Sequence, residues 1–301
     1  MRTRTDHNQP EQVQLYVQRT ASECMNATAD FVRGSWRTLL SYSLLFLLPV
    51  AVVQSRGVVW MIANLIEDTD GGMTGSLTVT LIMLVVGFWL VNALVWGMMQ
   101  LHTTRNGGLN DLKWHEAWPV LRRTLWRMVP VTIIMTLVSA PLLSVYLVAS
   151  VIMPFVALAY GVAVIPILLI APIYLFEDST GLIQAVRKAF KMGFNNLGTL
   201  FMTGITLLVL VNVLEFIVFI PWAVTLYLFG TLVSDPHALS AADEAGLLTK
   251  AGFSLTSTAL CYCLYVAFCL VEITVGFVYG SATQARDDVS LIEDIHQFEN
   301  L

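Results

Sequence analysis

The chain has 301 residues, of which 56% are hydrophobic and 12% are charged. Because an ordinary soluble domain carries about 25% charged residues, this composition excludes a typical soluble globular protein and predicts an integral membrane protein. The formal net charge of −5 at pH 7 does not by itself exclude a class of protein, since basic and acidic residues are separated along the chain.

Six apolar segments are long enough to cross a bilayer as helices, which takes about 20 residues each. The third and fourth come from one uncharged run, Met128 to Phe176, which Pro154 divides into two halves of spanning length. We therefore predict an all-α integral membrane protein with six transmembrane helices, forming a single membrane domain over residues 1–301. The predicted spans are 36–66, 77–101, 128–149, 155–176, 197–232 and 251–281.

Amphipathic segments precede the first, third and fifth spans, at about 12–33, 111–125 and 181–194. In the last of these, cationic and bulky apolar side chains recur at helical spacing on opposite faces. The cations are Arg187, Lys188 and Lys191, and the apolar residues are Leu182, Val186, Phe190 and Phe194. We predict that the six spans form three hairpins, each preceded by a cytoplasmic interfacial helix; three unrelated segments are the alternative.

The basic residues predict the orientation of the chain, because Lys and Arg are retained on the cytoplasmic side of a membrane. Of the 16 basic residues, only Arg56 and Lys250 fall on the side that holds the acidic loops 67–76 and 234–246. We therefore expect a multi-pass protein of the cell's inner membrane with both termini in the cytoplasm. Since topology accounts for the basic residues, no nucleic-acid partner is expected.

The cations of the interfacial helices predict contact with membrane lipids. On the cytoplasmic side, a cation near an anionic membrane surface contributes about 1 kcal/mol to binding. The expected headgroup contacts are Arg187, Lys188, Lys191, Arg122 and Arg123.

The stretch APIYLFEDSTGLIQAVRKAFKMGFNN at 171–196 combines a Pro-containing span, an acidic residue at its end and an Ala-rich amphipathic helix. Together with the six-span plan, it resembles bacterial six-span membrane proteins related to the membrane domain of glycerophosphoryl diester phosphodiesterases. The resemblance implies architecture and not activity. A phosphodiesterase barrel of roughly 250 residues has no room outside the predicted spans.

No catalytic or cofactor-binding motif is found in the sequence. The stretch HEAWP at 115–119 lacks the second histidine of a zinc-protease motif, and no Walker loop, G-x-S-x-G or G-x-G-x-x-G is present. The four cysteines lack the C-x-x-C spacing of a redox or zinc site. We therefore expect no enzyme activity, no catalytic residue, no cofactor, no metal and no disulfide.

Ionisable residues inside the predicted spans form the one candidate site. Glu215 and Glu272 are the only carboxylates well within spans, and such residues usually face a bundle interior or a hydrated cavity. Asn92 and Asn212 could add to this intramembrane polar site. The predicted depths of the two carboxylates differ by roughly 13 Å, too far for a shared proton. Structural hydrogen bonding and a role in transport both stay open.

Two features near the C-terminus concern packing and docking. Gly276 and Gly280 form a G-x-x-x-G pattern, which predicts close helix approach within the protein. The tail, residues 282–301, is predicted to be cytoplasmic and to contain a short acidic helix that could dock on the basic interfacial helices or on a protein partner.

The sequence favours a non-enzymatic polytopic membrane protein that acts as an accessory, scaffold or regulatory subunit. A small transporter of solutes, ions or lipids that uses the intramembrane carboxylates is the alternative. An enzyme acting on lipid is a third interpretation, for which a nucleophile beside a base is expected and not found.

Overall fold

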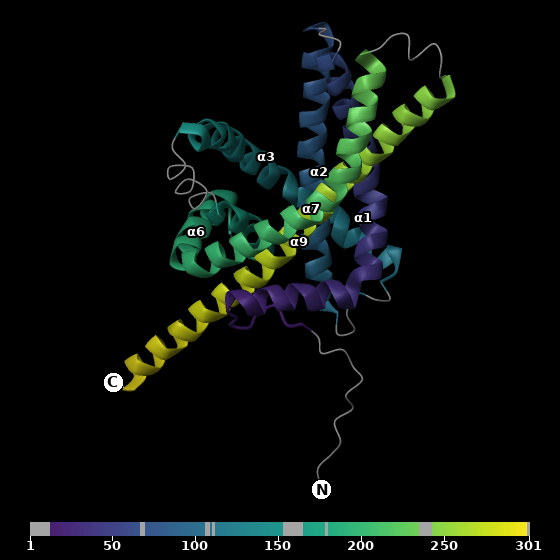
Figure 1. The fold of residues 1–301 in the computed structure, drawn as a ribbon. Helices are drawn as coiled ribbons and strands as arrows, with labels where there is room; N and C mark the ends of the chain where they lie inside the picture. The colour runs from purple at the N-terminus through teal and green to yellow at the C-terminus, as the bar shows by residue number, and fades with distance from the viewer. Residues whose placement is uncertain are drawn as a thin grey trace. The chain divides into compact units, whose positions relative to one another are not determined.

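The computed structural model describes residues 13–66, 70–105, 109, 112–152, 165–177, 180–234 and 243–299. Side chains are described over these ranges except at 70–71, 138–152, 165, 232–234, 243–246 and 287–299. Regular structure in these ranges is helical throughout, so the predicted all-α class is confirmed (Figure 1). The helices are α1 (Ala21–Ile66), α2 (Asp70–Thr104), α3 (Trp114–Ile152), the short 3-10 helix η1 (Ile165–Leu169), α5 (Ile170–Phe176), α6 (Leu182–Asn195), α7 (Leu197–Ser234) and α9 (Asp243–Glu299).

Four helical segments are long and apolar enough to cross a membrane. They are Ala21–Ile66, Gly72–Thr104, Leu197–Thr231 and Leu247–Arg286, and they contain four of the six predicted spans. Of the other two predicted spans, 128–149 has side chains described only to Leu137, and 155–176 lies partly outside the described residues. Helix α3 covers the backbone of the first, and the second is described only from Ile165 onward, as η1 and α5.

Helix α1 begins at Ala21 and not near residue 12, because a capping box starts it there. The Thr20 hydroxyl accepts from the Glu23 amide, and the Glu23 carboxylate accepts from the Thr20 amide at 2.7 Å. These reciprocal bonds satisfy amide groups that a helix start leaves without partners. The preceding residues, 13–19, form an irregular segment that we call the N-terminal segment.

The predicted interfacial helices at 12–33 and 111–125 are not separate helices. Helix α1 continues from Ala21 through Pro49 to Ile66, and α3 continues from Trp114 through Pro119 to Ile152. Proline removes one backbone bond, which membrane helices tolerate where neighbouring groups satisfy the freed carbonyl. Only the third segment is a distinct short helix: α6 covers Leu182–Asn195, shifted by one residue from the predicted 181–194.

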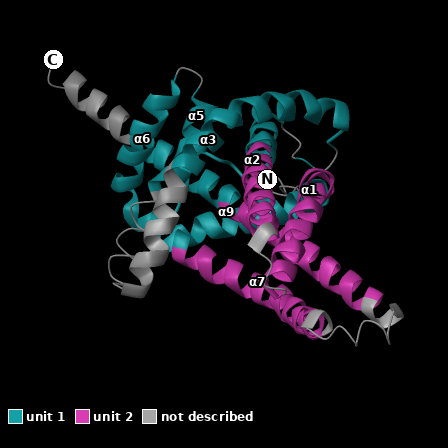
Figure 2. Cartoon of the chain, turned by 90° about the horizontal axis from the view of Figure 1, so that it is seen from above, with its two compact units in different colours: residues 1–40, 94–204, 272–301 teal, residues 41–93, 205–271 magenta. Residues whose placement is uncertain are grey.

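The chain divides into two compact units, drawn in different colours in Figure 2. Unit 1 comprises residues 1–40, 94–204 and 272–301, and unit 2 comprises residues 41–93 and 205–271. Each of the four long apolar helices therefore contributes one part to each unit. Unit 1 contains the first parts of α1 and α7, the final parts of α2 and α9, and the whole of α3, η1, α5 and α6.

Side-chain hydrogen bonds connect the helices of unit 2. On α9, Tyr262 bonds Ser43 of α1 at 2.8 Å, and Thr258 bonds Ser55 of α1 at 2.8 Å. Polar side chains that bond across helices stabilise membrane bundles, where apolar burial supplies little driving force. Tyr265 of α9 likewise donates to the backbone carbonyl of Met83 of α2 at 3.0 Å. Helix α9 is thus bonded to both α1 and α2.

Candidate functional site

Residues 272–283 of α9 form the buried centre of unit 1. The first part of α1 packs on this segment through a hydrogen bond from Thr28 to Thr274, 3.1 Å long, and through the rings of Phe31 and Phe277. Buried hydroxyl groups normally have a hydrogen-bond partner, and this bond between the two helices supplies one.

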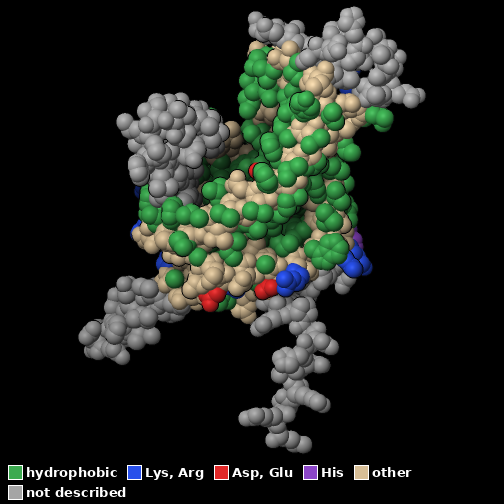
Figure 3. Space-filling model, in the orientation of Figure 1, with side chains coloured by type: hydrophobic (Ala, Val, Ile, Leu, Met, Phe, Trp, Pro, Cys, Tyr) green, Lys and Arg blue, Asp and Glu red, His purple; other side chains and the backbone are tan. Residues whose placement is uncertain are grey.

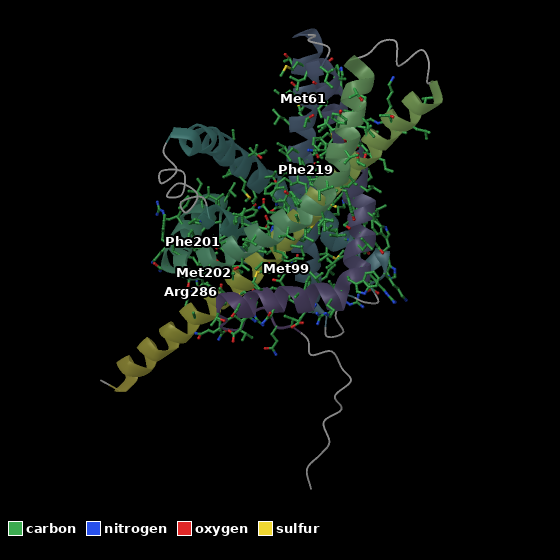
Figure 4. All side chains as sticks on the ribbon, in the orientation of Figure 1. Met61, Met99, Phe201, Met202, Phe219 and Arg286 are labelled. Carbon is green, nitrogen blue, oxygen red and sulfur yellow. The ribbon has the colours of Figure 1, made fainter. Side chains whose placement is uncertain are left out.

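Both glycines of the predicted G-x-x-x-G pattern permit close approach within unit 1. A Cβ atom at Gly276 would lie 2.5 Å from the Cε atom of Met99, which is labelled in Figure 4. A Cβ atom at Gly280 would collide with the carbonyl oxygen of Leu15. The expected close approach within the protein is confirmed, but the partner of Gly280 is the N-terminal segment and not a second helix.

Glu272 is the most deeply buried of the predicted site residues, with 1% of its surface exposed. Its carboxyl group accepts a hydrogen bond from the indole N–H of Trp96 on α2. The Oε2 atom of Glu272 has no hydrogen-bond partner among the described residues. Burial of an unpaired polar atom costs about 1–3 kcal/mol in proteins, so this carboxyl is held at a thermodynamic cost.

The other three predicted site residues belong to unit 2, whereas Glu272 belongs to unit 1. The side-chain amide of Asn92 is buried and donates to the Phe88 carbonyl of its own helix at 3.0 Å. That of Asn212 is exposed and donates to the Leu208 carbonyl at 2.7 Å. Glu215 is half-buried on α7 and lies close enough to Cys263 of α9 to interact electrostatically. The four residues are therefore not a single site within either unit.

A polar cluster in unit 1 surrounds Glu177, at the end of α5. Its carboxylate forms an ion pair with Lys188 of α6 and accepts a hydrogen bond from Thr180 at 3.0 Å. Tyr279 of α9 donates to the other carboxylate oxygen at 3.4 Å. Partial burial raises the pKa of Tyr16 in the N-terminal segment, and the negative charge of Glu177 raises it further. Glu177 thus joins three segments of unit 1.

Helix α6 presents three different faces. Its buried residues are Ala185, Ala189, Met192 and Gly193, three of which are small. A Cβ atom at Gly193 would collide with Pro166 of η1, so this face packs directly on the protein. The bulky residues Ile183 and Phe194 are exposed, as are the predicted lipid contacts Arg187 and Lys191. Arg122 and Arg123 of α3 are exposed too, whereas Lys188 is engaged by Glu177.

The N-terminal segment is fixed on unit 1 by hydrogen bonds at both of its ends. The Val13 carbonyl bonds the His102 ring at 3.0 Å. The Arg19 amide donates to the Ser281 hydroxyl at 2.8 Å, and this hydroxyl donates back to the Arg19 carbonyl at 3.1 Å. Beside Ser281 an open pocket of about 330 Å³ lies between this segment, the start of α7 and α9.

Sequence reasoning missed the Glu177 cluster and this pocket. The ion pair joins residues eleven positions apart across a turn, a spacing with no helical signature. The pocket combines three segments that are separated from one another by more than 70 residues in sequence. One signal was available: the T-x-x-E pattern at Thr20 marks the start of α1 and the end of the N-terminal segment.

Among the described residues, no three His, Cys, Asp or Glu side chains lie close enough together to hold a metal ion. The four cysteines, all within the described ranges, are free thiols. A comparison of the chain with protein-family models, with curated proteins and with solved structures finds no match.

Proposed function

We propose that this protein is a non-enzymatic, multi-pass membrane subunit that binds a transmembrane helix of another protein through α7. The observation that carries the proposal is that most of the surface of α7 is not covered by the described parts of this protein. Only 6% of the most apolar 18-residue stretch of α7 is buried inside the protein, whereas 56% of the corresponding stretch of α9 is buried. Figure 3 shows hydrophobic side chains over much of the drawn surface.

The proposed docking surface, which we call the α7 face, lies on the part of the helix that is least held by its neighbours. Residues Leu208, Asn212, Glu215, Phe216 and Phe219 fall at helical spacing along it. Leu208 and Phe216 are 62% and 63% exposed. The bonds that connect α7 to α9 lie further along, from Trp222 to Ser257 at 3.0 Å and between Thr225 and Thr256 at 2.7 Å.

Lipid alone is a poor match for the α7 face. The exposed Asn212 amide uses one donor on its own helix, and its remaining donor and acceptor would face acyl chains. A carboxylic side chain near the bilayer centre costs about 2.5–3.5 kcal/mol on an insertion scale, and such residues usually pair. A partner helix with a hydrogen-bonding side chain at the same depth would satisfy both Asn212 and Glu215.

Two features of unit 1 support an orientation with both termini in the cytoplasm of a cell with an inner membrane. Of the described Lys and Arg residues, only Arg56 and Lys250 lie in unit 2. Unit 1 also collects the first parts of α1 and α7 with the final parts of α2 and α9, as expected for helices that cross alternately up and down. Six crossings in three hairpins, as in the resembled phosphodiesterase membrane domains, complete the proposal.

Within this arrangement α6 would lie at the cytoplasmic membrane surface. Its small-residue face packs on the protein, its bulky apolar side chains would enter the lipid, and Arg187 and Lys191 would contact anionic headgroups. We propose the same headgroup role for Arg122 and Arg123.

The test is extraction of the native protein directly from its membrane into lipid nanodiscs, followed by mass measurement of the complex. Wild-type protein is expected to carry a stoichiometric membrane-protein partner. The double variant Asn212→Leu, Glu215→Leu should lose this partner, because its helix face no longer offers hydrogen bonds. Thr78→Val, which removes an exposed hydroxyl from α2, should keep the partner. Retention of the same partner by the double variant would overturn the proposal.

Transport of a solute, an ion or a lipid is the second candidate function, and the unpaired Oε2 atom of Glu272 is the observation that favours it. A buried carboxyl with a free oxygen is typical of proton and ion pathways in membranes. Transport would require the carboxyl itself, so Glu272→Gln should abolish it. Full function in Glu272→Gln would remove this candidate.

A further inference from the structure

The pocket beside Ser281 is lined by polar side chains from two separate segments of unit 1. The N-terminal segment and the first turn of α1 supply Gln18, Arg19, Thr20 and Glu23, and the start of α7 supplies Asn196 and Thr199. Small residues of α9 line the remaining wall. A volume of about 330 Å³ is at the lower end of the range for small-ligand sites, roughly 300–1,000 Å³, and suits a small polar group.

Arg19 provides a cation whose position on the pocket wall is fixed. Its guanidinium lies over the ring of Phe277, with the Cζ atom 5.4 Å from the ring centre. Two of its N–H groups donate to the carbonyls of Gln14 and Leu15. Because a guanidinium has five N–H donors, three stay available for a ligand. No salt bridge to Arg19 is found in the described ranges, although its charge interacts electrostatically with the Glu23 carboxylate.

Glu23 provides an anion on the same pocket. Its Oε2 atom accepts from the amide and from the hydroxyl of Thr20, at 2.7 and 3.0 Å. Its other oxygen has no hydrogen bond to a described residue. Arg19 and Glu23 do not form a salt bridge with each other, although both line the pocket. The pocket thus presents one fixed cation and one fixed anion, each with bonding capacity to spare.

This pair of charges selects for a ligand that carries both signs. A purely anionic group would be attracted by Arg19 and repelled by Glu23. A purely cationic group would be attracted by Glu23 and repelled by Arg19. The lining residues of α7 and α9 lie near the predicted cytoplasmic span boundaries at 197 and 281, which is the depth of lipid headgroups. We propose that the pocket binds the phosphoethanolamine headgroup of a zwitterionic lipid, with the phosphate at Arg19 and the ammonium at Glu23.

The inference rests on the proposed cytoplasmic placement of unit 1, but not on the partner of α7. A bound headgroup would join the N-terminal segment to α7 and α9. A ligand that binds only the folded state raises stability, so lipid occupancy would stabilise unit 1.

The experiment is native mass spectrometry of the full chain, released from nanodiscs that contain equal amounts of phosphatidylethanolamine and phosphatidylglycerol. Wild-type protein should retain one phosphatidylethanolamine in preference to phosphatidylglycerol. Glu23→Gln keeps the bonds that cap α1 and removes only the charge, so the preference should fall about tenfold, the equivalent of one charge-assisted bond. Ala285→Leu should fill the pocket and abolish retention.

Asp30→Asn, which removes an exposed carboxylate of α1 outside the pocket, is the matched control and should behave as wild type. Equal retention of the two lipids by wild-type protein, or an unchanged preference in Glu23→Gln, would overturn the inference. A second arm adds soluble O-phosphoethanolamine to lipid-free protein in detergent. A rise in unfolding temperature without retained lipid would assign the pocket to a soluble ligand and overturn the lipid assignment. Neither arm depends on the α7 face, so failure here and failure of the docking proposal are distinguishable.

Discussion

Gly280 of α9 lies directly against the carbonyl oxygen of Leu15, so that the N-terminal segment passes over the helix at a position that lacks a side chain. The Arg19 and Ser281 hydrogen bonds hold the segment there. Because backbone cannot move aside as a side-chain end can, Gly280→Ala should destabilise this contact by about 1–3 kcal/mol, a typical penalty for overpacking.

Limited proteolysis and the unfolding temperature in detergent measure this effect. Gly280→Ala should lower the unfolding temperature and expose the N-terminal segment to faster cleavage. The control is Gly252→Ala in the same helix, where a Cβ atom meets nothing within 4 Å. That change should be neutral or stabilising by up to about 1 kcal/mol. Equal behaviour of the two variants would show that the N-terminal segment does not press on Gly280.

The hydrogen bond from Trp96 to Glu272 predicts a difference between two substitutions of the carboxyl. Glu272→Gln keeps an acceptor for the indole N–H and should unfold close to the wild-type temperature. Glu272→Leu leaves that donor buried without a partner, a loss of about 1–3 kcal/mol. Thermal unfolding in detergent compares the two. If the leucine variant is as stable as the glutamine variant, the Trp96 bond has no structural role.

The Glu177–Lys188 ion pair should show measurable coupling. Its side chains are 18% and 30% exposed, so water screens the pair only in part. A double-mutant cycle with Glu177→Gln and Lys188→Met is expected to give a coupling energy of about 1 kcal/mol. The comparison pair is Asp30–Arg33, whose atoms are 3.9 Å apart on an exposed surface and whose coupling should be near zero. Equal coupling in both pairs would contradict a specific role for Glu177.

The proposed orientation predicts opposite labelling of two exposed positions. Arg187→Cys on α6 should react with a membrane-impermeant thiol reagent only after the cytoplasmic side is opened. Lys250→Cys on α9 should react in intact cells from which the outer layers have been removed. Native Cys24 and Cys261 are buried and contribute little background. Labelling of both positions from the same side would contradict the proposed topology.

Length and apolar composition were enough to predict helices of spanning length, but not which face of a helix meets protein. On α6 the sequence pattern gave the bulky apolar residues Phe190 and Phe194 the same face, and the usual rule for soluble proteins would bury them. Instead Ala185 and Ala189 are buried and Phe194 is exposed. In membranes small residues permit close helix contact and large ones can face lipid, so the rule for soluble helices does not transfer.

The sequence predicted individual residues of the candidate site, but not the contacts between them. The burial of Glu272 follows from its place inside an apolar span, which the sequence shows. Its bond to Trp96 joins residues 176 positions apart and depends on how α2 and α9 pack, which no local pattern encodes. For the same reason the pocket of Arg19 and Glu23 was not predicted, although the capping box that positions Glu23 is legible in the sequence.

The central claim, that the α7 face is covered by a helix of another protein, is tested by photo-crosslinking inside the native membrane. A photoreactive residue in place of Phe216 should give one discrete crosslinked protein, and the yield should fall when Asn212 and Glu215 are both changed to Leu. The same probe at the exposed Ile82 of α2 should give lipid adducts. Lipid adducts alone at position 216, a dimer of this chain, or a protein crosslink that survives the double substitution would contradict the claim.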